Sequence, residues 1–190
     1  MITASKKKRE NIAEYLLYMW QIEDIIRAYG LDLDRIKAGI VDTHAGLDEA
    51  KRKEMLEWYE SLIDMMRREG KTEKGHLQLN ENTLDDVARL HRRLLQDPKF
   101  AAYANQYYAT LPLIVELRAK AGDSKKDEIE TCFDALYGLL MLRLQKKEVS
   151  QATAEAAAQI SRFLALLAAY YKKDYNNELK FSSDEELTDI

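Results

Sequence analysis

Apolar side chains between residues 12 and 29 recur at alternating intervals of three and four residues, which is the period of one face of an α-helix. The same period returns over residues 156–170, near the other end of the chain. Both segments are longer than two helical turns, so each predicts an amphipathic helix that buries one face. The first seam consists of Ile12, Tyr15, Met19, Ile22, Ile26 and Tyr29.

Residues that form tight turns are scarce in this chain. Only 7 glycines and 2 prolines occur among 190 residues. A β-sandwich or a β-barrel needs many turns, and turns favour these two residue types, so an all-β fold is excluded. Hydrophobic residues make up 46% of the chain, which is enough for a core and argues against a disordered protein. We therefore predict an all-α fold.

Caps and breakers divide the chain, and they predict a single-domain bundle of six to seven helices over residues 1–180. Glycine tolerates the left-handed conformation in which many helices end, so Gly30, Gly70 and Gly122 predict three helix ends. Helix starts are predicted at residues whose side chains can accept a hydrogen bond from the first turn, namely Ser5, Thr83, Asp97 and Ser150.

Three segments interrupt the helical pattern. A polar connector, residues 70–82, has no helical period and is the one long connection. Pro112 lies inside a predicted helix, where it removes a backbone hydrogen bond and clashes with the carbonyl four residues earlier, so we predict a kink or a break near it. Residues 181–190 carry four acidic side chains, and we predict a disordered acidic tail there.

The formal net charge is -4, and the body of the chain has no broad basic face. The charge distribution therefore argues against nucleic-acid binding as a function of this chain, since phosphate contacts need such a face. A basic run at Lys6–Arg9 could contact nucleic acid or an anionic membrane, but a solvated helical turn is the favoured interpretation. The longest apolar runs, residues 136–142 and 163–171, are too short to span a bilayer. We expect a cytoplasmic protein without a membrane span.

Motifs that carry chemistry are missing from the sequence. A di-metal helical bundle needs two Glu-x-x-His pairs, and only Glu73 with His76 has this spacing. Phosphate-binding glycine loops and serine-nucleophile motifs are also absent. The single cysteine, Cys132, lies in an apolar stretch and is predicted to be a buried, inert thiol. We expect no metal and no cofactor, and we favour a protein that is not an enzyme.

His91 is the most informative histidine, because it falls on an apolar helix face with Val87 and Leu94. Together with nearby basic and aromatic residues it could line a pocket for an anionic or aromatic ligand. The favoured alternative is a hydrogen-bonded core histidine beside solvated arginines and core tyrosines. The candidate pocket consists of His91, Arg92, Tyr103, Tyr107 and Tyr108.

A second stripe on the first predicted helix combines polar and aromatic side chains. Tyrosine and tryptophan are frequent anchors of protein interfaces, so this stripe could contact a partner. It could equally be a solvated face with ion pairs between successive turns. The candidate interface stripe consists of Asn11, Glu14, Tyr18, Trp20 and Gln21.

The surplus of apolar and aromatic helix faces, without a catalytic set, favours a non-enzymatic helical protein that acts through protein–protein contacts as a homodimer. The alternative is a helical bundle that binds a small ligand, or an enzyme, and uses the His91 cluster. The segment Glu10–Asp24 resembles an uncharacterised bacterial family of all-helical proteins. That resemblance implies one helical domain of unknown function, and it implies no reaction, ligand or site residues.

Overall fold

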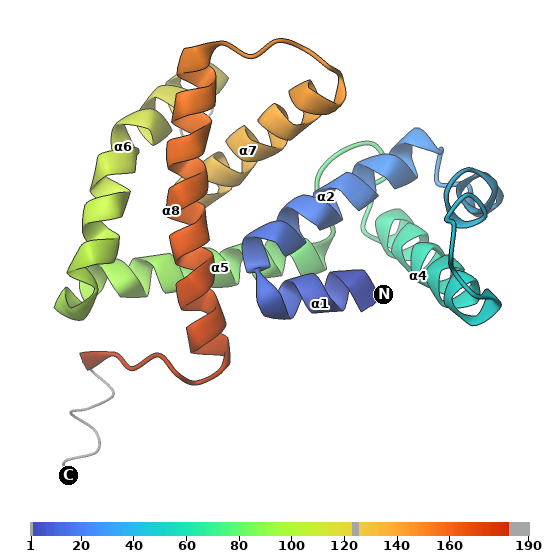
Figure 1. Cartoon of the computed structure of the whole chain (residues 1–190), viewed down its shortest axis with the longest axis horizontal. Coiled ribbons are helices and arrows are strands. Elements are labelled where there is room, and N and C mark those ends of the chain that lie inside the picture. The colour runs from blue at the N-terminus through green and yellow to red at the C-terminus, as the bar shows by residue number, and fades with distance from the viewer. Residues whose placement is uncertain (1, 123–125, 183–190) are drawn as a thin grey trace. The chain divides into compact units, whose positions relative to one another are not determined.

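The structure of the protein is a computed structural model that describes residues 2–122 and 126–182. These residues form eight α-helices and no β-strand, which confirms the all-α prediction and shows that the predicted count of six to seven helices was too low (Figure 1). A short π-helix, η1 (Lys37–Val41), and a 3₁₀-helix, η2 (Pro98–Phe100), complete the helical elements. The α-helices are α1 (Ile2–Glu10), α2 (Ile12–Ala28), α3 (Leu33–Ile36), α4 (Glu49–Arg68), α5 (Gln78–Gln96), α6 (Ala101–Ala121), α7 (Glu128–Leu144) and α8 (Gln151–Tyr175).

The contacts among these helices divide the chain into two compact units. Of the described residues, unit 1 comprises 2–9 and 14–83, and unit 2 comprises 10–13, 84–122 and 126–182. The first residues of α5 therefore belong to unit 1, whereas the remainder of that helix belongs to unit 2.

The additional helix arises because the first predicted helix is divided at Asn11. Its side-chain oxygen accepts a hydrogen bond from the backbone N–H of Ala13 at 3.0 Å. Asparagine favours this capping position, and it starts α2 directly after α1 ends at Glu10. Ser5 consequently lies inside α1, so the predicted helix start at Ser5 is wrong.

Pro112 does not break its helix, which corrects one of the two predicted outcomes. The helix α6 runs continuously from Ala101 to Ala121 with Pro112 inside it. Proline leaves the carbonyl of Tyr108 without its usual donor. Both Pro112 and Tyr108 are exposed, so water can bond to that carbonyl and the helix continues.

In unit 1, α5 begins five residues earlier than its sequence predicts, at Gln78 rather than at Thr83. The cap comes from other helices. The carboxylate of Glu69 accepts the N–H of Gln78 at 2.7 Å, and that of Glu23 accepts the N–H of Leu77 at 2.9 Å. Local sequence cannot reveal such caps, because both carboxylates come from elsewhere in the chain.

The core of unit 1 is built from the apolar faces of α2 and α4, closed at one end by α3 and η1. The predicted seam on α2 is confirmed from Tyr15 to Ile26, because its members there are at most 5% exposed. On α4, the buried residues follow the predicted helical stripes. They are Tyr59, Leu62, Ile63 and Met66.

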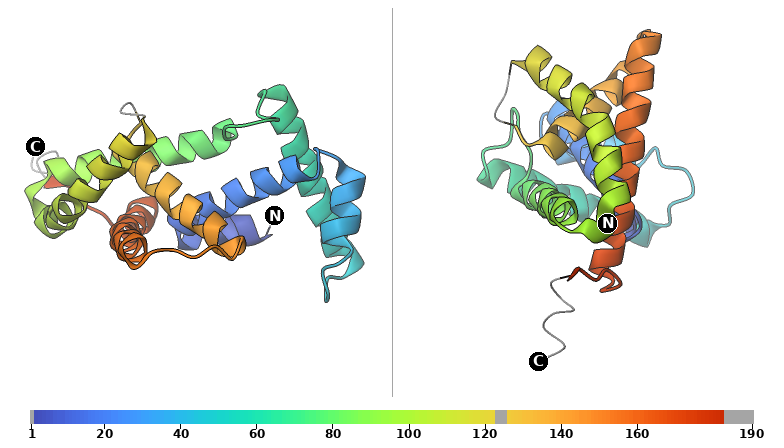
Figure 2. Two further views of the ribbon diagram at one scale, coloured as in Figure 1. Left: turned by 90° about the horizontal axis from the view of Figure 1, so that it is seen from above. Right: turned by 90° about the vertical axis from the view of Figure 1, so that its left-hand side faces the viewer.

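In unit 2, α6, α7 and α8 contact one another pairwise (Figures 1 and 2). The predicted starts of two elements are confirmed. Asp97 accepts the N–H of Lys99 ahead of η2, which leads into α6, and Ser150 accepts the N–H of Thr153 at the start of α8. The largest buried rings of this core are contributed by Tyr103, Phe133 and Phe163.

The chain after α8 turns back onto unit 2. Phe181 is 4% exposed and packs against Phe100, with the Arg93 guanidinium 3.9 Å from its ring centre. Ser182 donates both its backbone N–H and its hydroxyl to the Asp97 carboxylate. The acidic tail was predicted from residue 181 onward, and residues 183–190 of it lie outside the described residues.

Within the described part of the chain, none of the helices combines the length and the apolar character that crossing a bilayer requires.

Candidate functional site

The aromatic core of unit 2 surrounds His91, which lies on α5 and is 1% exposed. Its Nδ1 atom lies 2.6 Å from the hydroxyl oxygen of Tyr103. The rings of Tyr107 and Phe163 meet the imidazole edge-on, with centroids at 4.8 Å and 5.8 Å. Three of the five residues of the predicted pocket, His91, Tyr103 and Tyr107, are therefore brought together.

Burial fixes the protonation of this pair. It lowers the pKa of His91 to about 4, so the imidazole is neutral at pH 7. Burial also raises the pKa of Tyr103 far above its ordinary value, so the phenol keeps its proton. With the phenol assigned as the donor to Nδ1, the imidazole hydrogen is assigned to Nε2.

This Nε2–H group has no hydrogen-bond partner, although it is buried. The Glu128 carboxylate on α7 faces it, with Oε2 3.9 Å away, too far for a hydrogen bond. The Arg118 guanidinium, from α6, lies 3.7 Å from the other oxygen of Glu128. The Nε atom of Arg118 is also buried without a partner. Two unsatisfied donors thus come from side chains that flank one carboxylate.

Tyr107 also contacts this group of His91, Arg118 and Glu128. Burial is the main cause that raises its pKa to about 12, and the Glu128 carboxylate, which accepts a hydrogen bond from its hydroxyl, contributes next. Neither Glu128 nor Arg118 was a candidate from the sequence. They lie on different helices from His91, and no local spacing connects them to it.

The other two residues of the predicted pocket lie at the surface. Arg92 is exposed and pairs with Asp127, which caps α7, at 3.2 Å. Tyr108 is 59% exposed, and its ring lies tilted against that of Tyr107, at 5.2 Å between centroids. These two residues therefore frame the outside of unit 2 rather than the interior.

The predicted interface stripe on α2 also divides. Trp20 is 2% exposed and stacks on His76 at 4.2 Å, and Tyr18 is half-buried and stacks with Trp58 at 6.4 Å. The aromatic members of the stripe thus pack within unit 1.

The polar members of the stripe lie nearer to solvent. Asn11 caps α2, Glu14 is exposed and pairs with Lys7 at 2.9 Å, and Gln21 is half-buried. A short exposed pair of this kind contributes little to stability or to recognition by itself.

A buried carboxylate, Glu23, organises unit 1, and sequence reasoning missed it. Its side chain is fully buried and accepts three hydrogen bonds, from Nδ1 of His76 at 2.6 Å, from the N–H of Leu77 at 2.9 Å and from the Asn80 amide at 2.7 Å. Asn80 in turn accepts the Tyr15 hydroxyl at 3.2 Å. This network fastens the connector between α4 and α5 to the core helix α2.

The connector is held at a second point by Arg27, whose guanidinium donates to the carbonyls of Lys71 and Gly75. His76 pairs with Glu23, at 2.6 Å, rather than with the Glu73 that precedes it by three residues. In the described ranges, no three His, Cys, Asp or Glu side chains are grouped closely enough to hold a metal ion.

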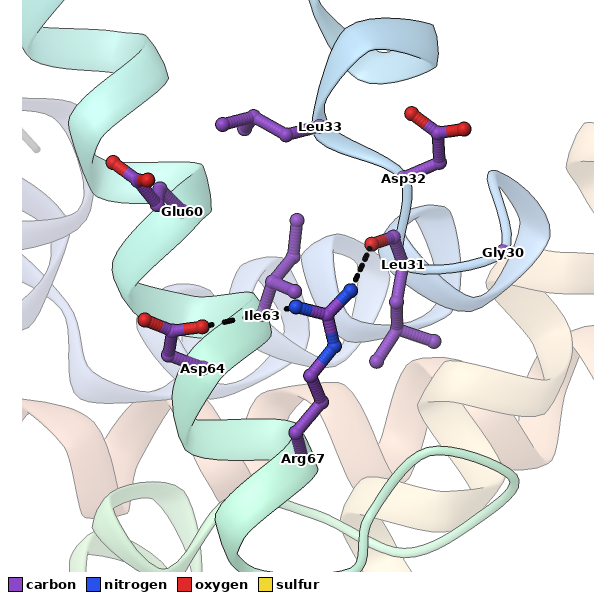
Figure 3. A pocket seen from close by; sticks show the side chains of 8 residues that line it. All are labelled: Gly30, Leu31, Asp32, Leu33, Glu60, Ile63, Asp64 and Arg67. Atoms are coloured by element: carbon purple, nitrogen blue, oxygen red, sulfur yellow. Dashed lines mark hydrogen bonds and ion pairs between the residues drawn. The ribbon is translucent and has the colours of Figure 1, made fainter.

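A hollow of about 400 Å³ opens on the surface of unit 1, between the turn after α2 and the helix α4 (Figure 3). Arg67 crosses it, with one guanidinium nitrogen 3.0 Å from the Leu31 carbonyl and another 3.8 Å from Asp64. Asp32 and Glu60 add two further carboxylates to the lining. The hollow is open and acidic, and its one cation is already engaged.

Cys132 lies in the core of unit 2 and is fully buried. Burial raises the pKa of its thiol to about 12, so almost no thiolate forms at neutral pH. The buried position of Cys132 agrees with its prediction as a core residue.

A profile of one protein family matches the chain over residues 1–178, and this family is described as a domain of unknown function, DUF4924. No curated protein and no solved structure matches the chain significantly. Because the profile covers nearly the whole chain, the protein belongs to the DUF4924 family of domains of unknown function.

Proposed function

We propose that this protein acts through protein–protein contacts as a homodimer, and that the exposed face of α6 is the surface through which two copies meet. A single observation carries the proposal, namely a solvent-exposed apolar seam along α6. The seam is defined by six exposed residues, Ala101, Asn105, Tyr108, Pro112, Val115 and Ala119.

The spacing of this α6 seam is that of a coiled-coil interface. Its members follow one another at intervals of four and three residues, and five of the six are apolar. A strip with this period lies along one side of a helix and matches the surface of a second helix. Tyr108 is 59% and Val115 is 56% exposed, so the largest members are left uncovered within one chain. Exposed strips of this kind commonly mark interaction sites.

The neighbouring row of the same helix shows what a solvated face looks like. Glu116 and Lys120 are both exposed and pair across one helical turn at 2.6 Å. No charged side chain interrupts the seam beside them. The uncharged face of α6 is therefore available for contact with a partner, while the neighbouring row with Glu116 and Lys120 remains solvated.

A second copy of the same seam is a suitable partner because the spacing is symmetric about the level of residue 110. In an antiparallel pair, Ala101 lies opposite Ala119, Asn105 opposite Val115, and Tyr108 opposite Pro112. Each contact then occurs twice, as a two-fold interface requires. The large Tyr108 ring meets a small residue, and the alanines allow the helix ends to approach closely.

The proposal predicts that Val115→Glu weakens self-association by about 10- to 100-fold, because a carboxylate would be buried opposite an uncharged surface. Sedimentation or light scattering over a concentration series measures this effect. The unmodified chain is expected to approach twice its chain mass of 22.0 kDa as its concentration rises.

The matched control is Leu144→Glu, which places the same charge on another exposed apolar side chain, 64% exposed, at the end of α7 and outside the seam. This variant is expected to associate like the unmodified chain. Equal association of all three proteins would remove the α6 seam from the interface, and a monomer at every concentration would refute the homodimer.

A further inference from the structure

We infer that the corner of unit 2 formed by His91, Arg118 and Glu128 binds a small organic carboxylate, which takes the place that the Glu128 carboxylate occupies in the free protein. This site is independent of the proposed dimer. It shares His91 and Tyr107 with the pocket expected from the sequence, but it replaces Arg92 and Tyr108 by Arg118 and Glu128, which are partly buried.

The first reason is the pair of buried donors that lack acceptors. His91 Nε2 and Arg118 Nε are both inaccessible to water and without hydrogen bonds. Buried polar groups of folded proteins are rarely left in this state, since each unmet group costs free energy. Both donors therefore favour an acceptor that is not part of the free chain's hydrogen-bonding pattern.

The second reason is the shape that an acceptor between the two donors must have. The two oxygens of Glu128 face one donor group each, with Oε2 3.9 Å from His91 Nε2 and Oε1 3.7 Å from an Arg118 nitrogen. A planar carboxylate therefore fits between the imidazole and the guanidinium, but Glu128 itself stays beyond hydrogen-bond distance. A free carboxylate can approach both donors closely, because no backbone holds it back.

The third reason concerns exchange and size. The Glu128 side chain is 34% exposed, so it can turn to solvent when a ligand enters. The space that it vacates is that of its own side chain, which is a propionate group. The rings of Tyr107 and Phe163 meet the imidazole of His91 edge-on and occupy the space on that side of it.

The native full-length chain is titrated with sodium propionate at constant ionic strength, while the imidazole resonances of His91 are followed by NMR. The inference predicts a saturable shift of the Nε2–H signal. Glu128→Ala removes the internal competitor, and its signal is expected to saturate at a propionate concentration lower by about tenfold or more. Propionamide, which has the same shape without the charge, is expected to leave the signal unchanged in both proteins.

Arginine variants locate the binding group. Arg118→Gln is expected to abolish the response, whereas Arg92→Gln, at an exposed arginine one residue from His91, is expected to retain it. If the Nε2–H signal of the native chain does not shift at propionate concentrations up to about 0.1 M, the inference is overturned. At that ionic strength the Debye length is only about 10 Å, so a weaker, non-specific attraction would not count as binding. A response to inorganic phosphate but not to propionate, or an equal response to propionamide, would overturn it as well. The titration of the native chain remains decisive if Glu128→Ala fails to fold.

Discussion

Replacement of Glu23 by alanine is expected to lower the free energy of unfolding of unit 1 by about 3–5 kcal/mol, the usual range when one partner of a buried charged network is removed. Three donors lose their acceptor at once, because Glu23 binds His76, the N–H of Leu77 and the amide of Asn80. All three contacts hold the connector against α2. In the Glu23→Ala protein the end of the connector should therefore detach from α2, and α5 should lose its first turn.

Urea denaturation followed by tryptophan fluorescence measures this loss, because both tryptophans of the chain, Trp20 and Trp58, belong to unit 1. The matched control is Asp24→Ala, which removes the adjacent carboxylate. Asp24 is exposed and pairs with Arg27 at 2.8 Å, so its removal is expected to cost less than about 1 kcal/mol. A Glu23→Ala protein as stable as the Asp24→Ala protein would show that the buried network does not hold unit 1 together.

Acid is expected to destabilise unit 2 through His91. The pKa of His91 is lowered from its ordinary 6.5 to about 4 in the folded protein, mainly by burial. The unfolded chain therefore binds a proton below pH 6.5 that the folded protein does not accept until about pH 4. Stability falls as the pH falls through this window, and it is regained as the pH rises. The full effect is about 3 kcal/mol, because one pKa unit corresponds to about 1.4 kcal/mol.

The thiol of Cys132 reports on unit 2 alone, since it is the single cysteine of the chain and is buried there. Its reaction with dithiodipyridine, which proceeds in acid, follows unfolding at each pH. His91→Gln keeps an acceptor for Tyr103 but cannot titrate. The stability of unit 2 in this variant should therefore not fall between pH 6.5 and 4 on account of residue 91. His44→Gln, at an exposed histidine of unit 1, should behave like the unmodified chain. An identical pH dependence of His91→Gln and the unmodified chain would contradict a neutral, buried His91.

The sequence predicts the helices correctly where a helix start, end or apolar face depends on neighbouring residues. The apolar seam of α2, the capping residues Asp97 and Ser150 and the helix end at Gly122 all depend on side chains within one or two turns of the feature they determine. The start of α5 does not follow, because the carboxylates that cap it come from Glu69, at the end of α4, and from Glu23, on α2. The outcome at Pro112 depends on whether the affected carbonyl faces water, which periodicity alone does not decide.

The candidate sites follow from the sequence only in part, for the same physical reason. The position of His91 on an apolar face predicts its burial, and its distance along the chain from Tyr103 is short. Arg118 and Glu128 reach His91 from two other helices, so only the tertiary fold brings them together. Glu23 looks like a surface residue in the sequence. The pattern of apolar and polar residues alone does not distinguish a buried carboxylate from a solvated one, because the partners that hold Glu23 come from other parts of the fold.

The most direct measurement of the proposed dimer uses cysteines introduced at Asn105 and Val115, which lie opposite each other when two α6 seams pair antiparallel. Oxidation of the double variant Asn105→Cys with Val115→Cys is expected to give a covalent dimer at concentrations where each single variant stays uncrosslinked. Cys132 is buried and does not contribute a thiol to the reaction. Crosslinking of either single variant with equal efficiency, or no crosslinking of the double variant under conditions in which the chain is dimeric, would contradict the antiparallel α6 interface.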